Sequence, residues 1–214
     1  MNLRDALDRV ADMRLRILES QKFRGYSGRA RALGGCAALV GALALRCVPE
    51  GVRHVGLPFI WGAVFVVAFT LNYGAVLRWW LKLSKAERAR SPLAPALENL
   101  PVFVVGGALT THQLTHGAIA SLPGVWASVL ALTHFTAKYA IPRGLRAVGW
   151  WYVAAGALLL AYPETGWREP AIPGLVFFLG EWAGGWCIFR AHHDGGLWAF
   201  LLGGERASKT GDAP

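Results

Sequence analysis

Long apolar runs separated by short polar or charged stretches dominate the hydrophobic pattern of this chain. They lie near residues 32–48, 55–78, 97–120, 122–140, 145–162 and 172–190. Each run is close to the roughly 20 residues that an α-helix needs to cross about 30 Å of hydrocarbon. The runs are continuously apolar, which excludes the alternating pattern of a membrane barrel strand. The pattern therefore predicts an all-α, polytopic membrane protein with six transmembrane helices in the segment 32–190.

Proline stands near the start of four of these runs. The first turn of a helix tolerates proline because the missing N–H would have no partner there. We therefore expect helices to begin close to Pro58, Pro101, Pro123 and Pro173.

The first 31 residues have a different pattern. Leu3, Leu7, Val10, Met13 and Ile17 recur at helical spacing between charged residues. This predicts an amphipathic helix over residues 2–22, followed by a basic juxtamembrane segment. Such a helix suits the membrane surface, and a solvated helix with a weak dimer seam is the alternative. Residues 191–214 are expected to form a cytoplasmic interfacial segment and a polar tail.

Composition supports a membrane protein. Of the 214 residues, 54% are hydrophobic and only 16% are charged, whereas soluble domains carry about 25% charged residues. The net charge of +9 would suit nucleic acid, but the charges lie between the apolar runs, where they set membrane topology. We therefore expect the partners to be the lipid bilayer and its anionic headgroups, with no nucleic acid.

The distribution of basic residues predicts the orientation. All but three of the 22 lysines and arginines lie on one predicted side of the membrane, and Arg46, Arg53 and Arg168 are the exceptions. Basic residues accumulate on the cytoplasmic side, so both termini are expected in the cytoplasm. The first apolar run follows a charged segment too long for a signal peptide, so we expect it to be retained as a membrane helix.

The segment 96–141 holds the only cluster of ionisable residues deep inside an apolar stretch. It contains His112, Gln113, His116 and His134, and a short polar gap at 121–124 divides it. We interpret it as a transmembrane hairpin that turns at this gap, with the other helices arranged around it.

Ionisable residues inside a membrane helix are candidates for function. His112 and His116 share one helix face, and Glu181 lies at a depth similar to that of His112. These two would meet if their helices were neighbours. Glu181, His112 and His134, with His116 and Gln113 beside them, therefore suggest a polar core or a relay for protons or small solutes.

Other uses of the histidines are also considered. A b-type haem would take His112 and His134 as axial ligands, although their depths differ by about 10 Å. A histidine-box metal enzyme would pair His112 and His116 with His192-His193, but these pairs lie on opposite sides of the membrane. Alternatively, the polar residues simply join helices through hydrogen bonds worth about 0.6 kcal/mol each.

Four short motifs suggest a family. They are Phe23-Arg24-Gly25-Tyr26, Leu97-Glu98-Asn99-Leu100-Pro101, Leu122-Pro123-Gly124-Val125-Trp126, and the stretch from Gly174-Leu175 to Gly180-Glu181. With these motifs the chain resembles a family of uncharacterised bacterial six-helix membrane proteins of acidobacterial and planctomycete type. The resemblance implies the six-helix plan and a bacterial inner membrane, and it implies no activity.

The sequence shows no pairing of nucleophile and base and no phosphate-binding loop, so we do not expect an enzyme. The leading hypothesis is a non-enzymatic interaction or membrane-response component without cofactor or metal, with a protein partner through residues 2–22. The alternatives are a proton or small-solute pathway through Glu181, His112 and His134, and a haem carrier.

Overall fold

The structure is a computed structural model that describes residues 25–90, 93, 97, 99–136, 144–193 and 196–202. Helix is the only regular structure in these residues, which confirms the all-α prediction. The main helices are α2 (Gly28–Arg46), α3 (Glu50–Lys82), α6 (Leu100–Thr115), α7 (Leu122–Thr136), α8 (Leu145–Ala161) and α10 (Ala171–His192). Short helices are α4 (Lys85–Arg90), η1 (Ile119–Ser121), α9 (Pro163–Arg168) and α11 (Leu197–Leu202). The expected helix at 2–22 and the polar tail from 203 lie outside the described residues.

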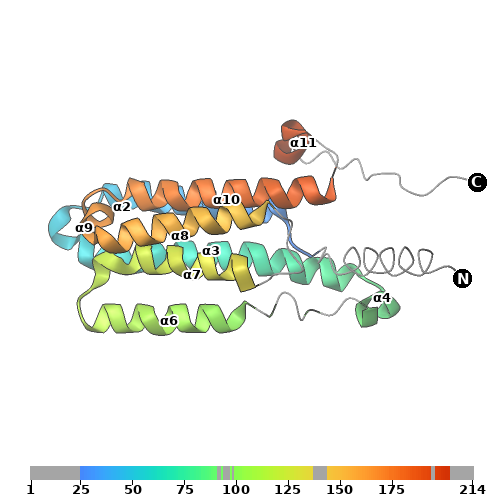
Figure 1. Ribbon diagram of the computed structural model, residues 1–214, viewed down its shortest axis with the longest axis horizontal. Coiled ribbons are helices and arrows are strands. Elements are labelled where there is room, and N and C mark those ends of the chain that lie inside the picture. The colour runs from blue at the N-terminus through green and yellow to red at the C-terminus, as the bar shows by residue number, and fades with distance from the viewer. Residues whose placement is uncertain are drawn as a thin grey trace, which may run out of the picture.

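The main helices run alongside one another as an elongated bundle (Figure 1). Among the described residues, α2, α3 and α10 are long and apolar enough to cross a membrane. Helices α6, α7 and α8 have 16, 15 and 17 residues. At 1.5 Å per residue they reach about 22 to 26 Å. Three of the six predicted spans therefore meet the requirements for a membrane helix by themselves.

Helix α2 begins earlier than its apolar run. Ser27 is its N-cap, and the Ser27 hydroxyl accepts a hydrogen bond from the Ala30 N–H at 3.3 Å. A serine at this position satisfies one of the free N–H groups of the first turn. As a result Arg31, which the sequence places among the cytoplasmic charges, lies inside the helix.

One of the four proline predictions is wrong. Helix α3 begins at Glu50, directly after Pro49, so Pro58 lies inside it rather than at its start. Pro101, Pro123 and Pro173 do stand in the first turns of α6, α7 and α10.

The turn of the 96–141 hairpin is also displaced from its predicted place. Helix α6 ends at Thr115, and Gly117 then adopts a φ of 74°. Glycine reaches this left-handed conformation without the steric cost that a Cβ would add. The chain therefore turns at 116–121, and residues 122–124 of the predicted gap form the start of α7.

The hairpin is not the centre of the bundle, contrary to our expectation. The most extensive helix contacts join α2 to α10, α7 to α8 and α2 to α3. Helix α6 packs mainly against α7 and lies at the edge of the bundle (Figure 1). Its only buried residue is Gly106, and large apolar side chains such as Val104 and Val105 are exposed on its surface.

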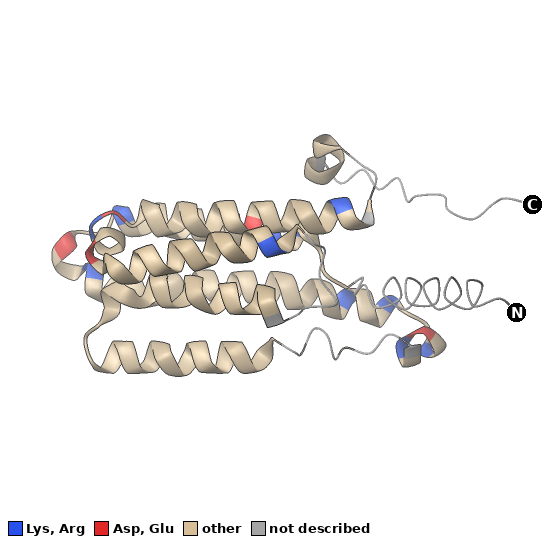
Figure 2. Ribbon diagram, viewed as in Figure 1, with Lys and Arg blue, Asp and Glu red and all other residues tan. Residues whose placement is uncertain are grey.

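Charged residues gather toward the two ends of the bundle (Figure 2). At the end formed by α9 and the α2–α3 turn, the buried Arg53 donates to the carbonyls of Trp167 at 3.2 Å and Val48 at 3.3 Å. Arg46 also lies 3.5 Å from Glu169. These contacts join the α2–α3 turn to the connection before α10.

The opposite end carries α4, which begins with a capping box. The Ser84 N–H donates to Glu87 Oε2 at 2.8 Å, and the Glu87 N–H donates to the Ser84 hydroxyl at 3.3 Å. Each partner satisfies a free donor of the other. The hydrogen bonds from Ser84 also lower the pKa of the Glu87 carboxyl.

Candidate functional site

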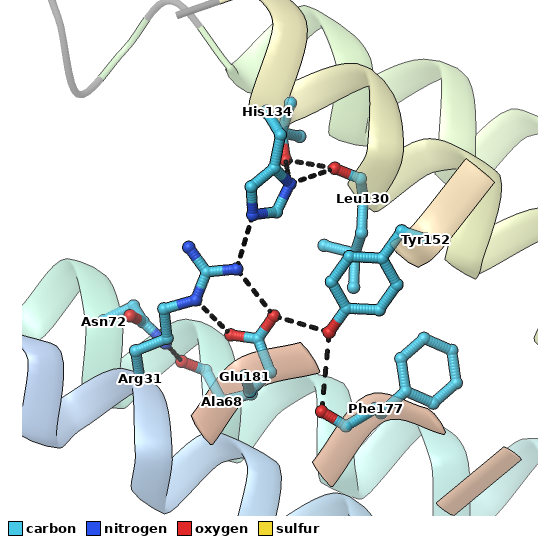
Figure 3. A network of polar contacts seen from close by, with 9 residues as sticks. Arg31, Ala68, Asn72, Leu130, His134, Tyr152, Phe177 and Glu181 are labelled. Carbon is cyan, nitrogen blue, oxygen red and sulfur yellow. Dashed lines mark hydrogen bonds and ion pairs between the residues drawn. The ribbon is translucent and has the colours of Figure 1, made fainter. Parts of the chain in front are cut away.

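A polar network lies between four helices of the bundle. It consists of Arg31 from α2, His134 from α7, Tyr152 from α8 and Glu181 from α10 (Figure 3). Glu181 is close to the middle of the 22-residue α10, so about 15 Å of helix extends on either side of it. The network therefore lies near the midpoint of α10, where the first turn of α2, which carries Arg31, and the last turn of α7, which carries His134, reach it.

An ion pair between Arg31 and Glu181 forms the centre of the network. Arg31 Nη2 donates to Glu181 Oε1 at 3.0 Å, and Arg31 Nε lies 2.9 Å from Oε2. The second contact is an ion pair without hydrogen-bond geometry. The two side chains are only 13% and 17% exposed, so each charge depends on the other for its stabilisation.

Tyr152 supplies a second donor to the carboxylate. Its hydroxyl lies 2.8 Å from Glu181 Oε1 and 3.4 Å from the Phe177 carbonyl. A phenol has a single proton to donate, and the shorter contact indicates that Glu181 receives it. Tyr152 is completely buried, which holds this donor in place.

The contacts of His134 identify its tautomer. Its Nε2 lies 2.7 Å from Arg31 Nη2, and its Nδ1 lies 2.6 Å from the Leu130 carbonyl. A guanidinium can only donate, so Nε2 must accept and the imidazole is neutral. Nδ1 then carries the proton and donates it to Leu130. His134 therefore contributes an acceptor and no charge.

Three glycines provide the space for these side chains. A Cβ on Gly184 would lie 2.6 Å from the Arg31 guanidinium carbon, and one on Gly35 would lie 2.9 Å from Glu181 Cβ. A Cβ on Gly180 would overlap the Tyr152 ring. Gly180 and Gly184 are four residues apart on α10, a spacing of small residues that allows membrane helices to approach closely.

The ion pair also borders a cavity of about 500 Å³. Helices α2, α3, α6, α7 and α10 all contribute to its lining. Pockets for small molecules usually measure about 300 to 1,000 Å³. The lining is mostly apolar and includes Phe65, Phe69, Tyr73, Phe103 and Trp126. We call these five residues the aromatic wall.

Two of the predicted site residues meet in this network. Glu181 and His134 approach one another through Arg31, which contacts both (Figure 3). The expected encounter of Glu181 with His112 does not occur, because the main neighbours of α10 are α2, α8 and α9 and do not include α6.

The remaining predicted residues lie near the end of α6. His112 and His116 are exposed, with stacked rings whose centroids are 4.1 Å apart. Gln113 is half-buried. Thr115 and His116 form hydrogen bonds to carbonyls of their own helix. Within the described part of the chain, no hydrogen bond or ion pair joins these residues to the Arg31–Glu181 pair.

Haem ligation by His112 and His134 does not fit this arrangement. An axial ligand needs a free lone pair on a ring nitrogen, and both nitrogens of His134 already have polar partners. The described residues also contain no group of three or more His, Cys, Asp or Glu side chains that would hold a metal ion.

Sequence reasoning missed Arg31 and Tyr152. Arg31 lies at the very start of its apolar run, where it is indistinguishable from a topology charge. The sequence indicates such a basic residue only through Glu181, because a carboxylate inside a membrane helix requires a partner. Tyr152 gave no signal, since aromatic residues are common in membrane helices.

Comparisons with protein-family models, with curated proteins and with solved structures give no match. The resemblance to a bacterial six-helix family therefore stays a prediction.

Proposed function

We propose that this protein is a non-enzymatic, six-helix integral membrane protein that binds a small apolar molecule inside the bilayer. Helices α2, α3 and α10 support membrane insertion by their length and apolar composition. Helices α6, α7 and α8 run alongside them (Figure 1). Large apolar side chains such as Phe59, Val66 and Leu158 are exposed on the bundle, and lipid tails would cover this surface.

The proposed orientation places both termini in the cytoplasm of a bacterium, with the protein in the inner membrane. Two groups of described charges support it. The end with α4 carries Lys82, Lys85, Arg88 and Arg90 beside a single acidic residue, Glu87. At the opposite end the acidic residues Glu50, Glu164 and Glu169 offset the basic Arg46, Arg53 and Arg168. A surplus of basic residues is typical of the cytoplasmic side.

The observation that carries the binding proposal is the cavity beside the ion pair. An apolar space of about 500 Å³ with a few polar groups at its border is typical of a ligand site. A molecule bound there would contact α3 and α6 on one side and α2 and α10 on the other. Binding would therefore link α6 to α2, α3 and α10, whereas α6 otherwise packs mainly against α7, and such a link suits a membrane-response component.

A proton or small-solute pathway has less support. Both oxygens of the Glu181 carboxylate contact Arg31, and one of them also accepts from Tyr152. A carboxylate held in this way is poorly placed to exchange protons. The proposed partner interaction through residues 2–22 lies outside the described residues.

The test compares two substitutions on the same helix. Gly62 and Gly74 both belong to α3, and a Cβ on either would meet no atom within 4 Å. Only Gly62 lines the cavity. Gly62→Phe should therefore fill the cavity, while Gly74→Phe is a matched control for the added bulk and the lost glycine.

Native mass spectrometry of the protein released from its own membranes provides the measurement. We expect apolar small molecules to remain bound to the wild type and to Gly74→Phe and to be lost from Gly62→Phe. Gly107→Phe, which enters the same cavity from α6, should act like Gly62→Phe. Equal retention by all four proteins would contradict the proposal.

A further inference from the structure

We infer that the ligand of this cavity is a flat, uncharged molecule with a hydrogen-bond acceptor, such as a ketone or quinone carbonyl. We further infer that Arg31 binds the acceptor through Nη1. The inference rests on the proposed function, because it assigns a chemical class to the molecule in that cavity. Three independent features of the site lead to it.

The first feature is the unused pair of donors on Arg31. A guanidinium has five N–H donors. Nη2 faces Glu181 and His134, and Nε faces Glu181. Nη1 has no polar partner among the described residues, and Figure 3 shows it on the side of the guanidinium away from Glu181. Arg31 also lines the cavity. The two N–H donors of Nη1 are therefore available to an acceptor on a molecule in the cavity.

The second feature is the charge balance of the site. Arg31 and Glu181 are the only charged residues that line the cavity within the described part of the chain, and they neutralise one another. His134 accepts from Arg31 and is neutral, and Tyr152 keeps its proton. An anionic ligand would bring an extra, unbalanced charge into a low-dielectric space, which is strongly unfavourable. The acceptor should therefore belong to an uncharged group.

The third feature is the aromatic wall. Its rings contact one another in pairs, with centroids separated by 4.3 Å for Phe69 and Tyr73 and by 5.0 Å for Phe65 and Trp126. Phe103 lies 6.1 Å from Phe69 and 6.5 Å from Trp126. Aromatic rings pack favourably against other rings in offset or edge-to-face geometry. A flat ring system would be accommodated here better than a branched chain of the same volume.

Three probes of nearly equal shape separate these features. 2-Ethylnaphthalene has no acceptor, 2-acetylnaphthalene has a neutral carbonyl, and 2-naphthoate has an anionic carboxylate. Binding is measured by equilibrium dialysis of the full chain in lipid nanodiscs against nanodiscs without protein. We expect 2-acetylnaphthalene to bind about tenfold more tightly than either of the other probes, since one hydrogen bond to a charged donor is worth at least that factor.

The variant Arg31→Lys tests the donor. Lysine keeps the positive charge opposite Glu181 but lacks the planar fork with its free Nη1 donors. We expect the preference for 2-acetylnaphthalene over 2-ethylnaphthalene to disappear, while the affinity for 2-ethylnaphthalene stays within about twofold. If the wild type and Arg31→Lys prefer 2-acetylnaphthalene over 2-ethylnaphthalene by the same factor, the role of Arg31 as the donor is overturned.

The outcomes also distinguish the inference from the proposed function. If the three probes bind equally and Gly62→Phe abolishes their binding, the cavity is a binding site but the ligand class is wrong. Preferential binding of 2-naphthoate would likewise overturn the neutral-acceptor inference. If no probe binds above protein-free nanodiscs, or if Gly62→Phe leaves binding unchanged, the proposed function itself fails.

Discussion

The two sides of this bundle are packed in opposite ways. Half of the most apolar window of α2 and 44% of that of α10 are buried, whereas only 6% of the window of α3 is buried. The difference follows from side-chain size. Gly28 of α2 and Gly185 of α10 are so close that a Cβ on either would overlap the backbone of the other. The aromatic wall is made of side chains from α3, α6 and α7, and where these rings lie between α3 and the other two helices the backbones stay apart.

The comparison shows how a bundle of apolar helices places polar groups, and the proposed membrane location gives a reason for it. Lipid tails are as apolar as leucine, so there is little hydrophobic force between helices inside a bilayer, and close contact depends on small residues. The close packing of α2 against α10 brings Arg31 and Glu181 together. The loose packing of α3 against α6 leaves the cavity that the ion pair borders. The four predictions below test this contrast, and the expected effects are largest on the closely packed side.

The largest effect is expected from breaking the ion pair. Glu181→Leu leaves Arg31 as an unpaired charge and should destabilise the protein by about 3 to 5 kcal/mol. The double variant Arg31→Met/Glu181→Leu removes both charges and should unfold at nearly the wild-type denaturant concentration, because Tyr152 keeps the Phe177 carbonyl as acceptor. Unfolding in mixed micelles, followed by tryptophan fluorescence, measures both. If the double variant is as unstable as Glu181→Leu, the unpaired charge of Arg31 is not the cause of the lost stability.

The next effect should come from a single added methyl group. In Gly184→Ala the new Cβ would lie 2.6 Å from the Arg31 guanidinium carbon. Overpacking costs about 1 to 3 kcal/mol, and we expect about 2 kcal/mol because the displaced group is charged and buried. Gly107→Ala on α6 is the control, since its Cβ would meet no atom within 4 Å. Equal stability of Gly184→Ala and Gly107→Ala would contradict the proposed contrast between the closely packed α2–α10 side and the loosely packed α6 side.

A smaller effect is expected when the acceptor of Arg31 is removed. His134→Leu deletes a hydrogen bond to a charged group and should cost about 1.5 kcal/mol. His134→Gln supplies a carbonyl oxygen that can accept from Arg31 and should recover most of this stability. The same unfolding measurement applies. If His134→Gln and His134→Leu are equally destabilised, the assignment of His134 as a neutral imidazole that accepts from Arg31 would be incorrect.

The smallest effect is expected on the loosely packed side. Trp126 of α7 donates to the hydroxyl of Thr110 on α6 at 2.9 Å. Thr110→Val removes this interhelical hydrogen bond, which is worth about 0.6 kcal/mol in membrane proteins. Thr111→Val serves as its control, because the Thr111 hydroxyl bonds only to Gly107 of its own helix at 3.1 Å. A loss above 2 kcal/mol for Thr110→Val would mean that α6 is packed more firmly than the structure indicates.

Much of the fold was predictable from local features of the chain. The long apolar runs correspond to the six main helices, and the three prolines at 101, 123 and 173 mark helix starts correctly. The predictions failed where a short-range signal was ambiguous. Pro58 predicts a helix start, but the helix already begins after Pro49. The polar gap at 121–124 predicts the turn of the hairpin, but the turn includes Gly117.

About half of the candidate site was predictable. Glu181 and His134 stood out because charged or titratable groups are rare inside apolar runs. Arg31 and Tyr152 did not, because arginine is ordinary at the end of a membrane helix and tyrosine is ordinary within one. The expected meeting of Glu181 with His112 required helix neighbours that the sequence does not specify.

The sequence by itself determined that this chain forms apolar helices, where most of them begin, and that a carboxylate would need a partner inside them. Each of these follows from residues close together in the chain. Only the tertiary structure decided that the partner is Arg31, 150 residues away, and that a cavity borders the pair. Helix pairing depends on contacts such as Gly28 with Gly185, in which each glycine matters only because of the distant residue that it allows to approach.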